Sequence, residues 1–401
     1  MRICDFIRVS LISLLLVNPI MVQWKVPLFK MYCDDDDIQS VVSILKRGMF
    51  WGLSNETLQF EKMLTEITGT KHCVVFNSGT SALHAIMIAY GIKNPEEVIV
   101  PSFTFIATAN APLFVGAIPR FSDIEESTYG LDPKDVNTKI TEKTKAIIPV
   151  HYAGNVCKIE ELRELAHDSK VLLIEDAAAA LGSSKGKKMA GSFGDSSIIS
   201  FAWNKITTSG EGGAVLTDSK EIYEKLILIR SHGRIDKENY FMSANSPDYV
   251  TLGYNWRISA MTAALGLSQL KKLDNLINMR IKNSEYLSSQ LSKFSFIETP
   301  KNSDSGICNY MMYTIRIKSG KKVRDQLHSF MTKKGIQTKV IFEPIHLTEF
   351  YRKKYGYKEG LLPITELVSH EVLTLPMFPH LQKHEMDYII ESVHEFQETL
   401  S

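Results

Sequence analysis

The sequence has little of what marks several large classes of protein. Its five cysteines lie far apart and form no CxxC pair, which argues against a disulfide framework or a zinc site and favours a reducing compartment. Basic and acidic side chains nearly balance, at a net charge of +1. No overall positive field is therefore available to hold a nucleic acid or an anionic membrane, and neither is expected as a partner.

Long hydrophobic runs are also missing. The longest mostly apolar stretch covers residues 6–22 with a core at 11–17, which is shorter than the roughly 20 apolar residues that span a bilayer. Arg2 and Arg8 precede this core, as in a signal peptide, but Asp5 lies among them and Asn18-Pro19 makes a poor cleavage site. An upstream extension, with Met21 as the true start, is the alternative. Residues 1–22 are thus an uncertain hydrophobic extension.

What remains is the composition of an ordinary soluble protein, with 44% hydrophobic and 23% charged residues. Short apolar runs alternate with helical stretches, which predicts a mostly parallel central sheet with helices on both faces. The predicted strands are 73–76, 97–100, 118–121, 146–150, 171–174, 197–201 and 214–217. The predicted helices among them include 81–90, 107–115 and 159–166. In such α/β sheets the chemistry lies at the carboxyl ends of the strands.

The ends of the chain complete the predicted organisation. The acidic run 34–37 precedes an apolar-periodic stretch, which indicates a helix start and not a metal site. A polar segment at 231–249 lacks periodicity, and 260–291 predicts long helix, with or without an interruption. The alternation at 311–317 predicts a half-buried strand, and 323–334 a helix ended by Gly335. We expect a large domain at 23–258 and a smaller C-terminal α/β domain at 259–401.

Three segments at predicted strand ends carry candidate chemistry. The turn 77–80 offers hydroxyls and free N–H groups to an anion, although an ordinary capped helix has the same pattern. Glu175 and Asp176 follow a buried strand and precede a run of alanines, where capping acids are equally common. Lys205 follows the strand at 197–201 and precedes the glycine-rich stretch 210–213, although a single lysine is usually a solvated surface residue. The glycines lack the GxGxxG spacing, and the chain contains no GxxxxGK[ST] or HExxH motif.

Together the three segments match what pyridoxal 5'-phosphate requires. The cofactor needs an anion site for its phosphate, a lysine that forms the Schiff base, and a carboxylate beside its pyridine nitrogen. A lysine released from the cofactor can also move protons, provided that its surroundings lower its pKa. The combination is more informative than any one segment.

Ordered blocks of sequence resemble one known family. VPLF (26–29), SGTSALH (78–84), PSFTFIATAN (101–110), PVH (149–151), EDAA (175–178), GEGG (210–213), GYNWR (253–257), EPIH (343–346) and LPM (375–377) follow one another in the family's order. The chain thereby resembles the DegT/DnrJ/EryC1/StrS sugar aminotransferases, which have the aspartate aminotransferase-like fold of PLP fold type I. The resemblance runs from about residue 26 to about residue 381.

The resemblance implies roles around the cofactor ring. Lys205 would be the Schiff-base lysine, and Asp176 would pair with the pyridine nitrogen. Phe105 falls where the family places an aromatic ring against the cofactor. Ala179 stands where many relatives have Gln, His or Glu, which leaves the tuning of the cofactor, though not its binding, open.

The resemblance also implies the residues around the phosphate and the sugar. Gly79, Thr80 and Ser200 would hold the phosphate, and Asn255 would reach the phosphate of a neighbouring subunit in a homodimer with shared sites. His346 falls in the wall on the sugar side, with a packed histidine as the alternative.

The resemblance implies a cytoplasmic aminotransferase that acts on a nucleotide-linked keto-deoxysugar, with L-glutamate as the expected donor. The block 200–213 looks most like perosamine-synthase-type members, which favours amination at sugar C4 for surface glycan biosynthesis. Two alternatives stay open: a PLP-dependent sugar dehydratase or isomerase of the same fold, and a non-catalytic, membrane-tethered regulator. Lys205 argues against the dehydratases, because those relatives carry histidine in its place.

Overall fold

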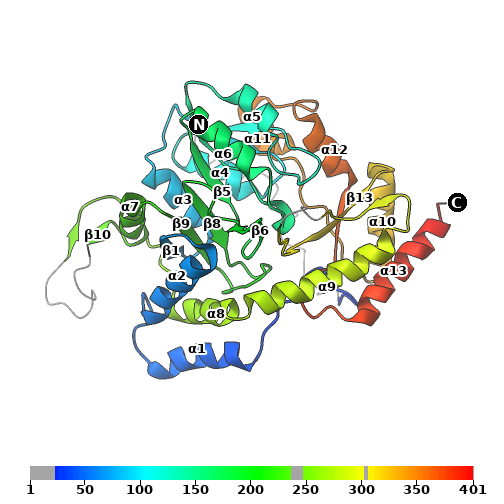
Figure 1. The fold of residues 1–401 in the computed structure, drawn as a ribbon, viewed down its shortest axis with the longest axis horizontal. Coiled ribbons are helices and arrows are strands. Elements are labelled where there is room, and N and C mark those ends of the chain that lie inside the picture. The colour runs from blue at the N-terminus through cyan, green and yellow to red at the C-terminus, as the bar shows by residue number, and fades with distance from the viewer. Residues whose placement is uncertain (1–22, 236–246, 302–305, 401) are drawn as a thin grey trace, which may run out of the picture.

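A seven-stranded sheet forms the centre of the protein, in the order β1-β9-β8-β5-β4-β2-β3 (Figure 1). The computed structural model describes residues 23–235, 247–301 and 306–400. The strands of the sheet are β1 (His72–Phe76), β2 (Glu97–Pro101), β3 (Ile118–Ser122), β4 (Thr144–Ile147), β5 (Leu172–Asp176), β8 (Ser196–Ser200) and β9 (Gly213–Thr217). All of them run in one direction except β9, which pairs antiparallel with both β1 and β8. The predicted mostly parallel sheet is confirmed.

Helices cover both faces of this sheet, as the sequence predicts. Because successive strand side chains point to opposite faces, Val75 packs on one face while Val74 and Phe76 pack on the other. The first face is covered by α2 (Asn55–Thr68), α6 (Ile159–Asp168) and α8 (Ala260–Leu270). The second face is covered by α3 (Gly79–Ala89), α4 (Ile106–Phe114) and α7 (Lys220–Arg230).

The acidic run near the amino end starts a helix, as predicted. Asp34 caps α1 (Asp35–Arg47), and Asp34 and Asp37 each accept a hydrogen bond from the other's backbone N–H in a capping box. Asp37 is also buried against α8, where it accepts hydrogen bonds from Ser268 Oγ (2.6 Å) and Gln269 Nε2 (2.7 Å). The acids therefore serve helix capping and helix packing.

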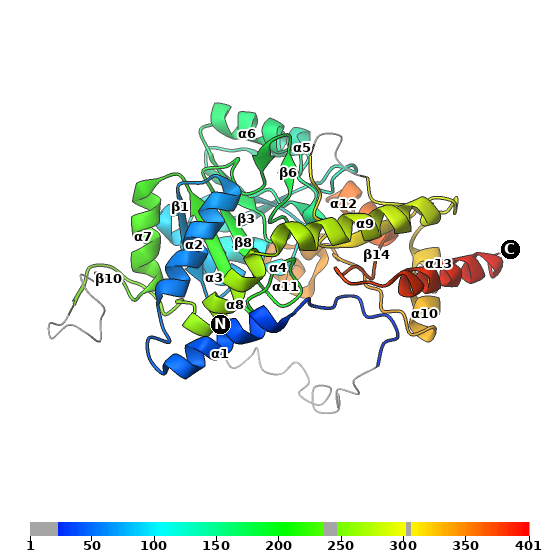
Figure 2. The ribbon, with the colours of Figure 1, turned by 60° about the horizontal axis from the view of Figure 1, so that its bottom comes forward.

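The predicted long helix after residue 260 is interrupted. α8 ends at Leu270, and α9 (Leu273–Leu291) continues toward the C-terminal part of the chain (Figure 2). That part contains β12 (Ile297–Glu298), β13 (Tyr313–Ile317), β14 (Val372–Leu375), α10 (Lys321–Lys333), α11 (Glu349–Tyr355), α12 (Pro363–Glu371) and α13 (Lys383–Glu398). It has a hydrophobic core of its own, which includes Val26 from the amino end.

The remaining elements are short. They are α5 (Pro133–Lys139), the 3-10 turns η2 (Tyr152–Gly154) and η3 (Ile345–Leu347), and the strand pairs β6 (Ser184–Lys185) with β7 (Lys188–Met189) and β10 (Arg234–Ile235) with β11 (Asp248–Tyr249). β10 and β11 are the two ends of the polar 231–249 segment, and residues 236–246 between them lie outside the described residues. The hydrophobic extension 1–22 lies outside them as well. Within the described part of the chain, no helix is long and apolar enough to cross a membrane.

One prediction about the C-terminal part is wrong. The alternation at 311–317 predicted a half-buried strand, but every residue of β13 is buried. The polar members of the alternation have partners inside the protein: Thr314 bonds Thr374 (3.0 Å), and Arg316 forms ion pairs with Glu371 and Glu126. Polar side chains at alternate positions therefore marked internal contacts here and not a solvated face.

Candidate active site

The predicted site segments meet at one edge of the central sheet. β1, β2, β5 and β8 run in the same direction, so their carboxyl ends lie at the same edge of the sheet. The turn 77–80 follows β1, Phe105 lies just beyond β2, Asp176 ends β5, and Ser200 ends β8 with Lys205 beyond it. Segments far apart in sequence thus share one site.

The turn after β1 has the geometry of an anion site. Ser78 caps α3 by accepting the N–H of Ser81 (3.0 Å), and Ala82 N–H donates to Ser78 O (3.1 Å). Gly79 and Thr80 are the first two residues of α3, so their N–H groups have no partner within the helix and lie at its positive end. Ser200 lies against this turn, because a Cβ built on Gly79 would lie 3.3 Å from Ser200 Cβ.

Lys205 and Asp176 form the charged centre of the site. Burial lowers the pKa of Lys205, and the nearby carboxylate of Asp176 opposes that effect. Burial also raises the pKa of Asp176, which the hydrogen bonds it accepts and the charge of Lys205 oppose. A lysine with a lowered pKa is a better nucleophile and proton carrier near neutral pH.

Asp176 is held in place by two hydrogen bonds. Its Oδ2 accepts the hydroxyl of Thr108 at 2.7 Å, and its Oδ1 accepts the N–H of Ala178 at 3.2 Å. Asp176 is 5% exposed and Thr108 is 1% exposed. The sequence reasoning missed Thr108, although it lies in the block 101–110, one helical turn after Phe105.

Phe105 is an exposed aromatic ring at the start of α4. Its side chain is 61% exposed, and its ring centroid lies 6.5 Å from that of Phe342. A large apolar ring left open beside buried charged groups is available to a flat ligand. Its place fits the predicted stacking role.

Asn255 lies next to the turn 77–80 of its own chain, the predicted phosphate turn. The backbone of the following residue, Trp256, accepts the N–H of Asn77 at 2.9 Å. Asn255 itself is exposed. A contact from Asn255 to the phosphate of a second subunit stays a prediction.

His346 is held among buried polar partners. The side chain is fully buried, and Ser102 Oγ lies 2.8 Å from Nδ1 and Glu366 Oε1 lies 3.1 Å from Nε2. The carboxylate of Glu366 can only accept, so Nε2–H donates to it; Nδ1 of the neutral ring then accepts the hydroxyl of Ser102, whose oxygen accepts the backbone N–H of His346 (3.0 Å). Burial lowers the pKa of His346, against the opposing effect of Glu366. With both nitrogens engaged, the geometry favours the packed histidine over a sugar contact.

The comparisons with known proteins agree with this geometry. Residues 32–394 match the model of the DegT/DnrJ/EryC1/StrS aminotransferase family. The chain belongs to this family. It is 34% identical to GDP-perosamine synthase of Escherichia coli O157:H7, over 85% of this chain and 90% of that protein. It is 35% identical to the UDP-4-amino-4,6-dideoxy-N-acetyl-beta-L-altrosamine transaminase of Campylobacter jejuni, over 80% and 85%.

A solved structure supports the same assignment. The PMP-form of the putative sugar aminotransferase Spr1654 from Streptococcus pneumoniae has a TM-score of 0.89 and 27% identity, and covers 94% of this chain and 100% of that one. This family member is accordingly an α/β protein of PLP fold type I and a sugar aminotransferase. Its cofactor is pyridoxal phosphate.

The residues at the sheet edge fit that cofactor. The start of α3 offers N–H groups and hydroxyls to a phosphate, and Phe105 offers an apolar face to a flat ring. Lys205 and Asp176 supply the amine and the carboxylate at one site. Bound there, the cofactor supplies an aldehyde for the amine and a ring that accepts electrons.

Two further buried side chains of this sugar aminotransferase lie beside the end of β5 and the loop that follows it. His151 is fully buried with Nε2 2.9 Å from Glu175 Oε2, and its backbone N–H donates to Asp176 O (3.1 Å). Asn309, from the C-terminal part, donates through Nδ2 to the carbonyls of Ala179 (3.0 Å) and Leu181 (2.9 Å). The loop that follows Asp176 is thus fixed through its backbone, while Ala179 offers no polar side chain to the cofactor.

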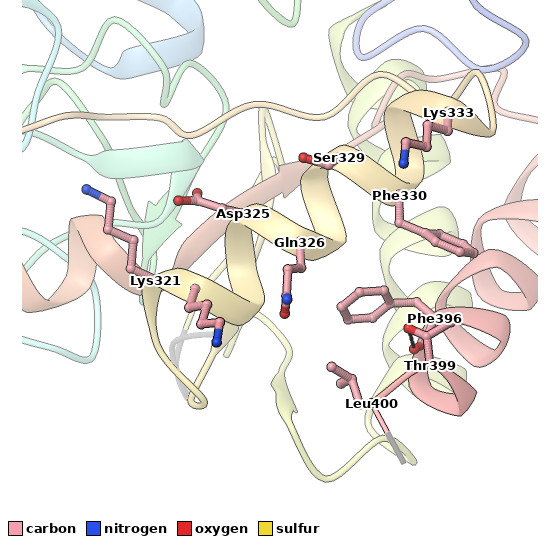
Figure 3. A pocket seen from close by; sticks show the side chains of 10 residues that line it. Lys321, Asp325, Gln326, Ser329, Phe330, Lys333, Phe396, Thr399 and Leu400 are labelled. Carbon is pink, nitrogen blue, oxygen red and sulfur yellow. Dashed lines mark hydrogen bonds between the residues drawn. The ribbon is translucent and has the colours of Figure 1, made fainter.

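A large cavity lies elsewhere. It measures about 780 Å³ and lies between α10 and α13, where Phe330 and Phe396 face each other and Lys321 and Lys333 lie on the rim (Figure 3). None of its lining residues belongs to the predicted site. The cavity is therefore not the catalytic centre of this sugar aminotransferase.

Gly213→Ala is expected to weaken cofactor binding. A Cβ at residue 213 would lie 2.4 Å from Ser78 O and 2.5 Å from Gly79 N, so the phosphate turn would have to move. Overpacking of this kind costs about 1–3 kcal/mol, so the dissociation constant of pyridoxal phosphate should rise about 5- to 160-fold if the whole cost falls on binding. An absorbance titration of the apoenzyme measures it. Gly130→Ala is the matched control, because a Cβ there would lie 2.3 Å from Cys157 Cβ and overpack a region away from residues 77–80; equal affinities in both variants would contradict the prediction.

Proposed function

We propose that this aminotransferase moves an amino group from L-glutamate to the C4 keto group of a nucleotide-linked 6-deoxysugar, for surface glycan biosynthesis. The observation that carries the proposal is the Lys205–Asp176 pair beside the phosphate turn, which supports amino transfer in a chain of this family. The names of the two curated relatives support the finer assignment, since one makes a perosamine and the other a 4-amino-4,6-dideoxy sugar.

In this proposal each predicted site residue has one task. Lys205 binds the aldehyde of the cofactor and carries protons between donor, cofactor and sugar. Asp176 pairs with the pyridine nitrogen, and Phe105 covers the ring. Gly79, Thr80 and Ser200 hold the phosphate, and Asn255 reaches the phosphate of the second subunit. His346 has no free polar atom in this geometry and carries no sugar contact here.

The test is a panel of nucleotide keto-sugars supplied with glutamate or with other amino donors. A product one amine richer at C4, formed only with glutamate, is the expected result, read by mass and NMR. Stoichiometric formation of pyridoxamine phosphate from glutamate alone separates a transaminase from a dehydratase. A product aminated at C3, or a donor other than glutamate, would overturn the finer assignment and leave the aminotransferase activity intact.

A homodimer with shared active sites is part of the proposal. Large apolar side chains at the start of α2 and beside β11 are exposed in the single chain: Phe50 (41%), Trp51 (46%), Leu58 (64%) and Leu252 (77%). Of these, Phe50 and Leu58 line one surface hollow together with Leu53, and exposed apolar side chains gathered in one place are typical of a protein interface. Sedimentation is expected to give twice the 45.3 kDa of the chain, and a monomer at micromolar concentration would contradict the dimer.

A cytoplasmic location is also proposed. The four cysteines in the described part of the chain, Cys33, Cys73, Cys157 and Cys308, are free thiols, and Cys73 and Cys157 are buried. Free thiols are usual in a reducing compartment. Fractionation of the native cells is expected to place the protein with cytoplasmic markers, whereas recovery in the membrane fraction would overturn this location.

A further inference from the structure

Behind Asp176 lies a short chain of buried hydroxyl groups. Thr108 Oγ1 lies 2.7 Å from Asp176 Oδ2, and Thr104 Oγ1 lies 3.0 Å from Thr108 Oγ1. Thr104 is 3% exposed and Thr108 is 1% exposed. Buried hydroxyl groups without partners are costly, so a chain of this kind fixes where each hydrogen points.

The direction of the hydrogen bonds depends on the charge of Asp176. An ionised carboxylate can only accept, so Thr108 donates its single hydroxyl hydrogen to Oδ2. The oxygen of Thr108 is then free to accept the hydroxyl of Thr104. Both hydroxyl groups are satisfied in this arrangement, which therefore favours the ionised acid over the protonated one.

The second oxygen of Asp176 has a different environment. Oδ1 accepts the backbone N–H of Ala178 at 3.2 Å, which leaves it a lone pair. Thr108 occupies Oδ2 from the side of α4, and the loop after β5 holds Oδ1. The carboxylate is thus held at both oxygens, and each oxygen keeps a lone pair for a ligand.

We propose that Thr108, supported by Thr104, is a positioning residue that keeps Asp176 ionised and aimed at the pyridine nitrogen of the cofactor. The inference rests on the proposed roles of Asp176 and Lys205. Thr108 acts only through Asp176 and is not itself a group that touches the cofactor. The same helix start carries Phe105, whose carbonyl accepts the N–H of Thr108 (3.1 Å), so α4 contributes both to the ring's face and to the acid at its edge.

Thr108→Val removes the hydroxyl and keeps the shape of the side chain. A hydrogen bond to a charged group contributes enough free energy that its loss should weaken the binding of pyridoxal phosphate about tenfold. The pH titration of the visible absorption of the lysine-bound cofactor provides a second measurement. Without the Thr108 hydroxyl, Asp176 stabilises the protonated pyridine nitrogen less well. A pyridine nitrogen that has lost its proton no longer repels the protonated imine, so the pH midpoint of the titration should move to higher pH.

Matched variants separate positioning from simple packing. Thr108→Ser keeps the hydroxyl and should restore the wild-type midpoint and affinity. Thr104→Val should shift both in the same direction by less, because it removes only the second hydroxyl. Thr365→Val is the control: Thr365 is buried and donates to Asp123 Oδ1 at 2.7 Å, so it loses an equivalent bond away from the predicted cofactor residues and should leave the midpoint unchanged.

The outcomes distinguish this inference from the proposed function. If Thr108→Val and Thr104→Val both bind the cofactor with the wild-type midpoint and affinity, the positioning role is wrong and the function stands. An equal shift in Thr365→Val would likewise overturn it, because the effect would then be general. A wild-type protein that binds no pyridoxal phosphate would overturn the assignment of the site itself. If Thr108→Val fails to fold, Thr104→Val and Thr108→Ser still decide the question.

Discussion

Lys205→Arg is expected to abolish amino transfer while the protein stays folded. Arginine retains the positive charge beside Asp176, but its guanidinium does not form the covalent link to the cofactor's aldehyde. Loss of a residue that both links covalently and moves protons lowers turnover on the order of 10⁴-fold or more. The measurement is the rate of glutamate-dependent pyridoxamine phosphate formation in a single turnover.

Borohydride reduction tests the role of Lys205 independently. In the wild-type protein, reduction followed by mass mapping should place the trapped cofactor on the peptide that contains Lys205. Lys187→Arg, at an exposed position, should retain both the trapping and the activity. Trapping on another lysine, or an active Lys205→Arg variant, would disprove the assigned role of Lys205.

Asp176→Asn should cause the second largest loss. The amide has nearly the same shape but carries no charge, so the pyridine nitrogen loses the partner that keeps it protonated. Removing one well-placed electrostatic partner from an active site costs on the order of 10³-fold in turnover. We expect both half-reactions to slow, with pyridoxal phosphate bound more weakly and its visible absorption titrating at higher pH. Cofactor affinity and the pH midpoint should thus change in the same directions as in Thr108→Val, but by more.

The control for Asp176→Asn is a carboxylate that serves only the fold. Asp195 accepts the N–H of Leu173 at 2.8 Å, at the opposite end of β5. Asp195→Asn should lower the free energy of unfolding by about 1–2 kcal/mol and leave the cofactor spectrum unchanged. A spectrum altered equally in both variants would mean that Asp176 acts through stability and not through the cofactor.

Much of the central sheet could be predicted because its signals are local. Each strand is a short apolar run, and each site segment directly follows one, so chain direction alone brings Asp176 and Lys205 to a shared edge. The order of the strands, and the antiparallel course of β9, depend on contacts between distant segments that no single stretch of sequence records. The broken helix at 270–273 lies between two helical patterns and has no proline or glycine to mark it.

Thr108, which the sequence did not single out, and His346, for which it left two alternatives open, both depend on long-range partners. Thr108 is one of several polar residues in its block, and its role follows only from the approach of Asp176, which is 68 residues away. His346 is an ordinary histidine in a loop until Ser102 and Glu366 occupy its two nitrogens. The buried polar residues of β13 likewise have partners on other elements. Hydrophobic periodicity and sequence motifs therefore predict where the active site lies. They do not predict which polar side chains form hydrogen bonds with one another.

The bond between Asn309 and the loop after Asp176 has a consequence for any shortened form of the protein. Every predicted cofactor residue lies before residue 260, so a fragment ending there would contain the whole sheet and the complete set of cofactor groups. It would nevertheless lack the amide that ties down the carbonyls of Ala179 and Leu181. That amide is fitted so closely that a Cβ on Gly154 would lie 1.9 Å from Asn309 Oδ1. The loop that follows Asp176 is thus held in place partly by the chain beyond residue 260.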